Sequence, residues 1–286
     1  TFSGRWPMLG QCLLRFDWSS SLIIGVCLLK KEKWAFAGAL MSYAAFNRIF
    51  PALFFFPWLI LAIVEIIRTR RIPIHHMRFV GGAAAVAVFL SVSAVVLFGT
   101  QTIKESSANL LMHNASFSSH RIGLGTVLAF DGETTRQQIR EKGGLHAKEL
   151  FVQSTKKLRN FLGILSLIFI GYYVFRVKKP VHELIHFSMI PLFMMTTPQV
   201  NYYNMRILLI IWHAANLKHG LFHQIGIIAL FAIEVYAQWS HVSGVERFAV
   251  NAYASYGLLF YFLFVLAWML LQTIKSKKAQ TPQPNQ

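Results

Sequence analysis

Apolar runs long enough to cross a membrane as helices, separated by short clusters of lysine and arginine, constrain this chain most. A membrane span needs about 20 consecutive apolar residues, and charged side chains are costly inside it. The chain is 55% hydrophobic and only 14% charged, whereas a soluble domain carries about 25% charged residues. The pattern therefore predicts an integral membrane protein built from helices.

The predicted fold is all-α: a polytopic transmembrane helical bundle of about nine spans, formed as a single transmembrane domain by residues 1–286. A large exoplasmic loop is expected at about 99–160, and a disordered cytoplasmic tail at about 275–286. The apolar runs that define the spans cover residues 13–29, 34–47, 50–67, 78–98, 160–175, 181–197, 205–216, 220–236 and 251–272.

Much of the net charge of +17 is found where these runs end. Basic clusters flank the cytoplasmic ends of membrane helices and attract anionic headgroups. We therefore expect a multi-pass protein of a bacterial inner membrane or of the endoplasmic reticulum membrane, with its basic loops and C-terminus in the cytoplasm. Membrane lipids account for the charge, and no nucleic-acid partner is predicted. The clusters are KKEK at 30–33, RTRR at 68–71, RVKK at 176–179 and KSKK at 275–278.

Arg48 lies between two apolar runs, where a cation is costly. Because the basic clusters on either side both lie in the cytoplasm, residues 34–67 must leave and return as a hairpin. Its apex falls at 47–49, and Pro51 then lies in the first turn of the returning helix, where its missing N–H costs little. Two interpretations of Arg48 stay open: its guanidinium reaches headgroups at the exoplasmic boundary, or it binds a lipid-linked phosphate there.

The block from Arg15 to Pro57 combines an acidic helix start, a basic turn, a small-residue helix and a proline element. It reads RFDWSSSLIIGVCLLKKEKWAFAGALMSYAAFNRIFPALFFFP. In this order of features it resembles the integral-membrane glycosyltransferases of the GT-C superfamily, such as the GPI mannosyltransferases and their bacterial relatives. Asp17 occupies the acidic start, and RIFP occupies the family's Lys-x-x-Pro element, with Arg48 in place of lysine.

That resemblance implies an enzyme that moves a sugar, such as mannose, from a polyprenyl-phosphate carrier to an exoplasmic acceptor. Arg48 would bind the donor phosphate. Asp17, near the outer end of a span and one helix away from Arg48, is either the carboxylate that takes the proton of the acceptor hydroxyl or the ion-pair partner of Arg15 or Arg48. The family's catalytic aspartate lies in a first exoplasmic loop, which would precede Thr1, so the chain is expected to lack its N-terminal part. The alternative is a non-catalytic multispanning subunit, a degenerate GT-C fold that packs against other membrane-protein subunits of a larger complex.

The stretch LLMHNASFSSHRIGLGTVLAFDG, within the expected exoplasmic loop, adds two histidines and an arginine. His113 and His120 are seven residues apart, which places both on one face of a helix, and Arg121 follows. We expect either an interfacial helix whose polar side chains face water or part of a sugar-phosphate pocket. The stretch also resembles one in multispanning proteins that are grouped with GT-C enzymes.

A second polar turn, at 199–206, leads into an apolar run. Tyrosine is ordinary at membrane interfaces, but tyrosine and amide side chains also suit a sugar pocket, by stacking and by hydrogen bonding. Arg206 is a second candidate for a phosphate contact. The candidate substrate-binding residues of this turn are Gln199, Asn201, Tyr202, Tyr203 and Arg206.

Other membrane chemistries find little support in the residue pattern. There is no P-loop and no dinucleotide-binding fingerprint, so no nucleotide cofactor is expected. His213 lies in an apolar run and is expected to hydrogen-bond between helices rather than to hold a haem. No third ligand stands at metal-binding spacing beside His113 and His120. The predicted set of cofactors and metals is therefore empty.

Overall fold

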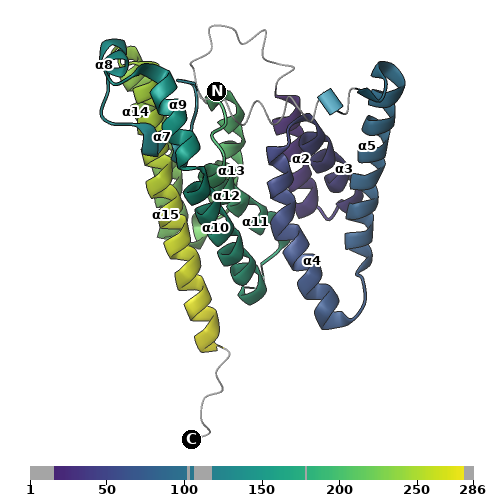
Figure 1. The fold of residues 1–286 in the computed structure, drawn as a ribbon. Helices are drawn as coiled ribbons and strands as arrows, with labels where there is room; N and C mark the ends of the chain where they lie inside the picture. Colours follow the sequence, from purple (N-terminus) through teal and green to yellow (C-terminus); the bar gives the residue numbers. More distant parts are fainter. Residues whose placement is uncertain (1–15, 102–103, 106–117, 178, 280–286) are drawn as a thin grey trace, which may run out of the picture.

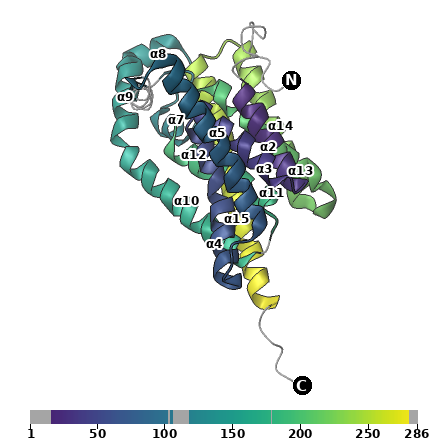
Figure 2. The ribbon, with the colours of Figure 1, turned by 90° about the vertical axis from the view of Figure 1, so that its right-hand side faces the viewer.

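The chain folds into a bundle of helices that run side by side. The computed structural model describes residues 16–101, 104–105, 118–177 and 179–279, and all regular secondary structure among these residues is helical. The longer helices follow roughly one direction and leave two opposite ends (Figure 1, Figure 2). The prediction of an all-α fold is confirmed.

Long helices alternate with short helical pieces along the chain. Where the structure describes the chain between α5 and α10, the helices are short, and 3-10 turns (η) divide the region that follows α10. The elements are α2 (Asp17–Lys30), α3 (Trp34–Asn47), η2 (Phe50–Phe54), α4 (Phe55–Thr69), α5 (Ile74–Phe98), α7 (Leu124–Ala129), α8 (Arg136–Glu141), α9 (Gly144–Ser154), α10 (Lys156–Arg176), α11 (Val181–Leu184), η3 (Ile185–Ser188), α12 (Met189–Met195), η4 (Val200–Arg206), α13 (Ile207–Ala215), η5 (Leu217–His219), α14 (Leu221–Val242) and α15 (Arg247–Ala279).

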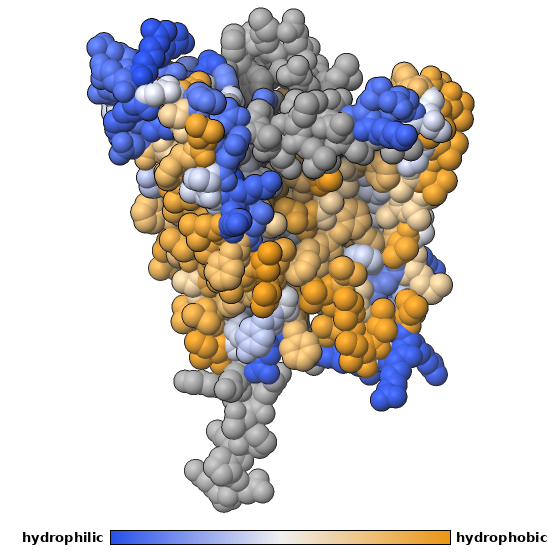
Figure 3. Space-filling model, in the orientation of Figure 1, coloured by the Kyte–Doolittle hydropathy of each residue, from blue (hydrophilic) through white to orange (hydrophobic). Residues whose placement is uncertain are grey.

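Within the described residues, five helical segments are long and apolar enough to cross a membrane, which supports a multi-pass membrane protein. On the face shown in Figure 3, hydrophobic side chains cover most of the middle of the molecule, and hydrophilic ones gather mainly toward its ends. The apolar stretch of α5 contains no buried residue, so much of this helix is exposed at the surface of the molecule. The five segments are Phe50–Thr69, Ile74–Phe98, Lys156–Arg176, Leu221–Val242 and Arg247–Ser276.

The other four of the nine predicted runs form helices that are too short for a full span. Helices α2 and α3 have 14 residues each, or about 21 Å at 1.5 Å per residue, whereas the hydrocarbon core is about 30 Å thick. Val181–Met195 and Asn204–Ala215 are also shorter apolar helices. In the part of the chain that the structure describes, five segments rather than nine have the length of a full span, because turns end the other helices earlier.

Helix α15 is longer than the apolar run that predicts it. The run covers 251–272, but the helix continues to Ala279. The expectation of a disordered tail over 275–286 is therefore wrong up to that residue, and 280–286 lie outside the described residues. Lysine and alanine are good helix formers, and cations are favourable near a helix C-terminus, which accounts for the extension.

Helices α3 and α5 pack so closely that backbone meets backbone. A Cβ atom placed on Gly38 would lie 2.1 Å from the carbonyl oxygen of Phe79, and one placed on Gly82 would lie 1.9 Å from the carbonyl oxygen of Ala35. Small residues permit this approach between helices in a membrane, where van der Waals packing drives association. The contact fixes how α5 lies against the hairpin that α3 begins.

Gly82→Ala is expected to destabilise the detergent-solubilised protein by about 1–3 kcal/mol, the usual cost of overpacking, because the new methyl group meets the Ala35 carbonyl. Gly81→Ala is the matched control, since a Cβ atom there has nothing within 4 Å and both variants gain the same helix propensity. Thermal unfolding followed by circular dichroism compares them. Equal midpoints for the two variants would contradict the close packing of α3 on α5.

Candidate functional site

The hairpin apex lies where the sequence pattern predicts it. Helix α3 ends at Asn47, Arg48 follows in an extended conformation (φ −147°, ψ 124°), and the 3-10 turn η2 begins at Phe50 with Pro51 in its first turn. Helix α4 then runs from this apex to the turn at 70–73, so the two turns mark opposite ends of the bundle. We refer to them as the hairpin end and the basic end.

The first turn of α2 packs against the apex and holds a carboxylate there. Oδ2 of Asp17 accepts a hydrogen bond of 2.7 Å from the hydroxyl of Tyr43, and Oδ1 accepts one of 2.7 Å from the backbone N–H of Trp18. The Trp18 ring meets Phe50 edge to face, at 5.1 Å between centroids. The residue after Asp17 thus contacts the turn that follows Arg48. Tyr43 is a polar member of this group that sequence reasoning missed.

A backbone pairing brings together two of the predicted polar segments. The N–H of Ile122 donates to the carbonyl of Pro198, and the N–H of Val200 donates to the carbonyl of His120. Arg121 and Gln199 face each other as an isolated antiparallel bridge. The candidates His120 and Arg121 therefore form one unit with Gln199, which lies almost 80 residues later in the sequence.

The helical interpretation of the stretch around His120 is wrong where the structure describes it. His120 lies in a turn and Arg121 in the extended bridge, because the carbonyl of His120 and the N–H of Ile122 bond to the 198–200 segment instead of within a helix. Nη1 of Arg121 also donates to the carbonyl of Thr197 at 2.9 Å. His113 lies outside the described residues.

Burial and the nearby guanidinium of Arg247 both lower the pKa of His120 from its ordinary value. Nη1 of Arg247 lies 3.2 Å from Nε2 of His120. The imidazole is therefore neutral at physiological pH and can accept a hydrogen bond from that guanidinium.

The side chain of Arg206 is buried rather than exposed for contact with a phosphate. It forms an ion pair with Glu234 of α14. The charge expected to bind substrate is thus neutralised inside the protein, and removal of Glu234 would leave the buried guanidinium of Arg206 without this counter-charge. Asn201, Tyr202 and Tyr203 belong to η4, and α2 packs against this turn.

A buried ion pair joins α9 to the turn before α8. Lys148 of α9 donates a hydrogen bond to Glu133, and both residues are buried. Burial alone would raise the pKa of Glu133, but the hydrogen bonds from Lys148 and from the backbone N–H groups of Glu133 and Asp131 hold it below its usual value. The carboxylate therefore stays charged and ties α9 to the turn before α8.

The histidine in the α13 run is used between helices, as predicted. Nδ1 of His213 lies 3.1 Å from Nδ1 of His223 on α14, and its Nε2 lies 2.8 Å from the hydroxyl of Tyr261 on α15. This network links three helices in the interior and gives both nitrogens of the His213 ring a hydrogen-bond partner.

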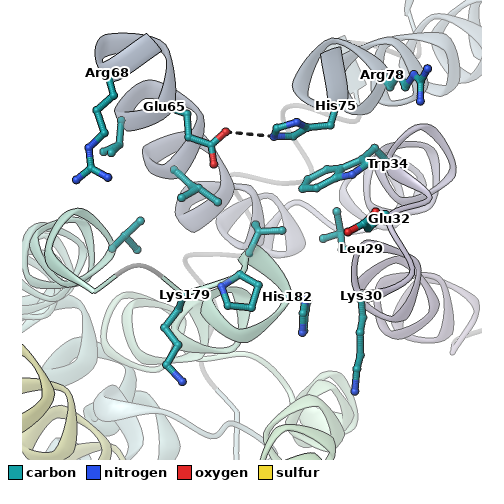
Figure 4. A pocket seen from close by; sticks show the side chains of 15 residues that line it. Leu29, Lys30, Glu32, Trp34, Glu65, Arg68, His75, Arg78, Lys179 and His182 are labelled. Atoms are coloured by element: carbon teal, nitrogen blue, oxygen red, sulfur yellow. Dashed lines mark ion pairs between the residues drawn. The ribbon is translucent and has the colours of Figure 1, made fainter. Parts of the chain in front are cut away.

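A cavity of about 650 Å³ opens at the basic end, between α2, α4, α5 and the start of α11. Three of the four basic clusters reach it, through Lys30, Arg68 and Lys179. Figure 4 shows the carboxylate of Glu65 pointing across the gap between α4 and α5 at the imidazole of His75. Sequence reasoning treated these cations only as membrane anchors, and so it missed the cavity.

Glu133→Gln is expected to destabilise the protein by about 3–5 kcal/mol, because it leaves the buried Lys148 without its counter-charge. Since the folded pKa of Glu133 is lowered, the stabilisation is full above the unfolded value of about 4.3 and is lost as the pH falls through the lower folded value. Glu141→Gln, at an exposed site, is the control and is expected to change stability by less than about 0.5 kcal/mol.

Thermal unfolding in detergent between neutral and acidic pH measures both effects. The gap between wild type and Glu133→Gln should be widest at neutral pH and should close in acid. An equal stability of wild type and Glu133→Gln at neutral pH would show that the ion pair between Glu133 and Lys148 does not stabilise the fold.

Comparison of the chain with protein-family models, with curated proteins and with solved structures finds no significant match. The residues of the hairpin end and their geometry are therefore the basis for a functional proposal.

Proposed function

We propose that the protein is a membrane glycosyltransferase, which moves a hexose such as mannose from a polyprenyl-phosphate carrier to an exoplasmic acceptor. The observation that carries the proposal is the contact between the first turn of α2 and the hairpin apex. The Trp18–Phe50 ring contact brings the helix start that carries Asp17, whose carboxylate is hydrogen-bonded to Tyr43, against the turn that follows Arg48. A cation for a phosphate and a carboxylate for a hydroxyl are the two groups that this reaction needs.

The proposed reaction uses these groups on opposite sides of the anomeric carbon. The acceptor oxygen forms a bond to that carbon as its proton passes to Asp17, and the bond to the phosphate oxygen breaks. The electron pair stays on the departing polyprenyl phosphate, whose charge the planar guanidinium of Arg48 stabilises. Each Asp17 oxygen accepts one hydrogen bond in the structure and retains a second lone pair for the acceptor proton.

The proposed orientation places the hairpin end outside and the basic end in the cytoplasm. It is supported by the cavity at which three basic clusters meet, because such clusters favour the cytoplasmic side. The segment from α7 to α9 then belongs to the large exoplasmic region. There the paired segments 120–122 and 198–200 would border the acceptor site.

A second candidate function, a non-catalytic subunit of a larger membrane complex, is favoured by one further observation. Polar groups that a substrate would use already have partners inside the protein: Arg206 pairs with Glu234, and Asp17 bonds to Tyr43. Internally satisfied polar groups are typical of structural sites. The two candidates differ in whether the protein transfers a sugar at all.

Arg48→Ala is expected to lower transfer from a polyprenyl-phosphate hexose by about 10–100-fold, since a hydrogen bond to a charged group contributes about 1.5–3 kcal/mol. Arg48→Lys should retain part of the activity, because lysine keeps the charge but loses the planar fork. Arg71→Ala at the basic end is the matched control. The measurement is transfer of radiolabelled sugar in membranes that contain equal amounts of each variant.

Three outcomes separate the interpretations. Loss in Arg48→Ala with normal transfer in Arg71→Ala supports a phosphate contact at the apex. Undiminished transfer in Arg48→Ala would remove Arg48 from the site and leave it as a headgroup contact. Absence of transfer by the wild type from polyprenyl-phosphate mannose, glucose and galactose would contradict the enzyme and favour the subunit.

A further inference from the structure

Three side chains with metal-binding atoms converge at the basic end, on the far side of the bundle from Arg48. Glu65 lies near the end of α4, and His75 and His76 lie in the first turn of α5. Oε2 of Glu65 is 3.2 Å from Nε2 of His75 and 3.0 Å from Nε2 of His76. The three residues can offer ligand atoms that all lie within 4.8 Å of one another.

These distances fit the edges of a small coordination polyhedron. Zinc binds imidazole nitrogen and carboxylate oxygen at about 2.0–2.1 Å in tetrahedral geometry, so neighbouring ligand atoms lie about 3.3 Å apart. The two separations from Oε2 of Glu65 differ from that value by a few tenths of an ångström. Two histidines and one glutamate also form a known type of zinc site in which the fourth position stays open.

The surroundings hold the two imidazoles in place. His76 is buried, and its ring lies 5.8 Å from Trp58 and 6.0 Å from Trp34. The ring of Trp34 also covers His75, at 4.6 Å between centroids. Because α3 packs backbone to backbone on α5, Trp34 has little freedom to move away. The histidines are thus preorganised on rigid helices, as a metal site requires.

The open side of the cluster faces the cavity. Glu65 and His75 line the cavity wall, and both are partly exposed to it, whereas His76 closes the cluster from behind. Four basic side chains and one further carboxylate, Glu32, line the same cavity. A divalent ion bound by Glu65 would add net positive charge, so an anionic group is the favoured fourth ligand. The basic side chains are Lys30, Arg68, Arg78 and Lys179.

We infer that Glu65, His75 and His76 bind one zinc-class divalent cation, whose free coordination position opens into the basic cavity and accepts an anion such as a phosphate group. The site lies at the other end of α4 from the proposed transferase site and is independent of it. Sequence reasoning missed it because Glu65 is separated from the histidine pair by the basic turn. The signal that could have found it is a carboxylate and a His-His pair at the facing ends of two helices joined by a short turn.

Metal binding to the purified full chain tests the inference. The protein is prepared in detergent without a histidine tag, stripped with a chelator, and titrated with Zn²⁺ by calorimetry and with Co²⁺ by visible absorption. We expect one ion per chain and, with Co²⁺, the intense visible bands of a tetrahedral site. Glu65→Gln and His75→Ala are each expected to weaken binding at least about tenfold, which is the least that loss of even an outer-shell partner costs.

His182→Ala is the matched control, because His182 lines the same cavity but is not one of the three ligands. It should bind zinc as the wild type does. Thermal unfolding of the stripped variants checks that they are folded, and Glu65→Gln keeps the shape of the side chain. Adding inorganic phosphate should shift the Co²⁺ spectrum of the wild type and leave that of His75→Ala unchanged.

The inference is overturned if the wild type binds no Zn²⁺ more tightly than the His75→Ala/His76→Ala double variant. It is also overturned if His182→Ala loses as much affinity as His75→Ala, since binding would then belong to scattered surface histidines. Both readouts are metal binding rather than sugar transfer. Failure here therefore leaves the proposed transferase function untouched, and loss of transfer in Arg48→Ala says nothing about this site.

Discussion

The close backbone contact between α3 and α5 is the interaction on which both candidate sites depend. Gly38 and Gly82 leave no room for a side chain at this contact, which locks the two helices in one register. At the start of α3, Trp34 then covers the imidazole of His75. At the end of α3, Arg48 forms the hairpin apex. One helix of 14 residues thus places groups of both sites, about 21 Å apart along its axis.

The two ends of the bundle carry different chemistry. At the hairpin end, the carboxylate of Asp17 and its Tyr43 partner lie beside the segment that carries Arg48, a set suited to an acceptor hydroxyl and a lipid phosphate. At the basic end, two imidazoles and Glu65 face a cavity lined by cations, a set suited to a metal ion and an anion. In the proposed orientation a membrane would separate these two environments by the length of a span, and each site would meet its ligands from its own side.

The sequence predicts well what depends on composition and local order. The helical class and the positions of five full-length spans follow from apolar runs, and the apex at 47–49 follows from the basic clusters and Pro51. Four other runs were expected to span as well. Composition does not show where a turn ends a helix, and helices such as α2 are therefore shorter than the predicted spans.

Contacts between distant residues account for most of what the sequence did not show. The 120–122 segment is extended rather than helical because it pairs with 198–200, and Arg206 is neutralised by Glu234, one helix later. The Glu65, His75 and His76 group forms only when α4 and α5 pack around their turn. The sequence predicts that Asn201, Tyr202 and Tyr203 lie in a polar turn, and the structure gives this turn as η4. Their role in substrate binding stays a prediction.

The orientation of the hairpin is the central claim, because an exoplasmic transferase site requires Arg48 to lie outside. Single cysteines at position 47 and at position 71, in a chain with Cys12 and Cys27 replaced by serine, test it with a membrane-impermeant thiol reagent. In sealed right-side-out vesicles, Asn47→Cys should react at once, and Arg71→Cys should react only after the membrane is permeabilised. Reaction of Asn47→Cys only after permeabilisation, or from the same side as Arg71→Cys, would contradict the account.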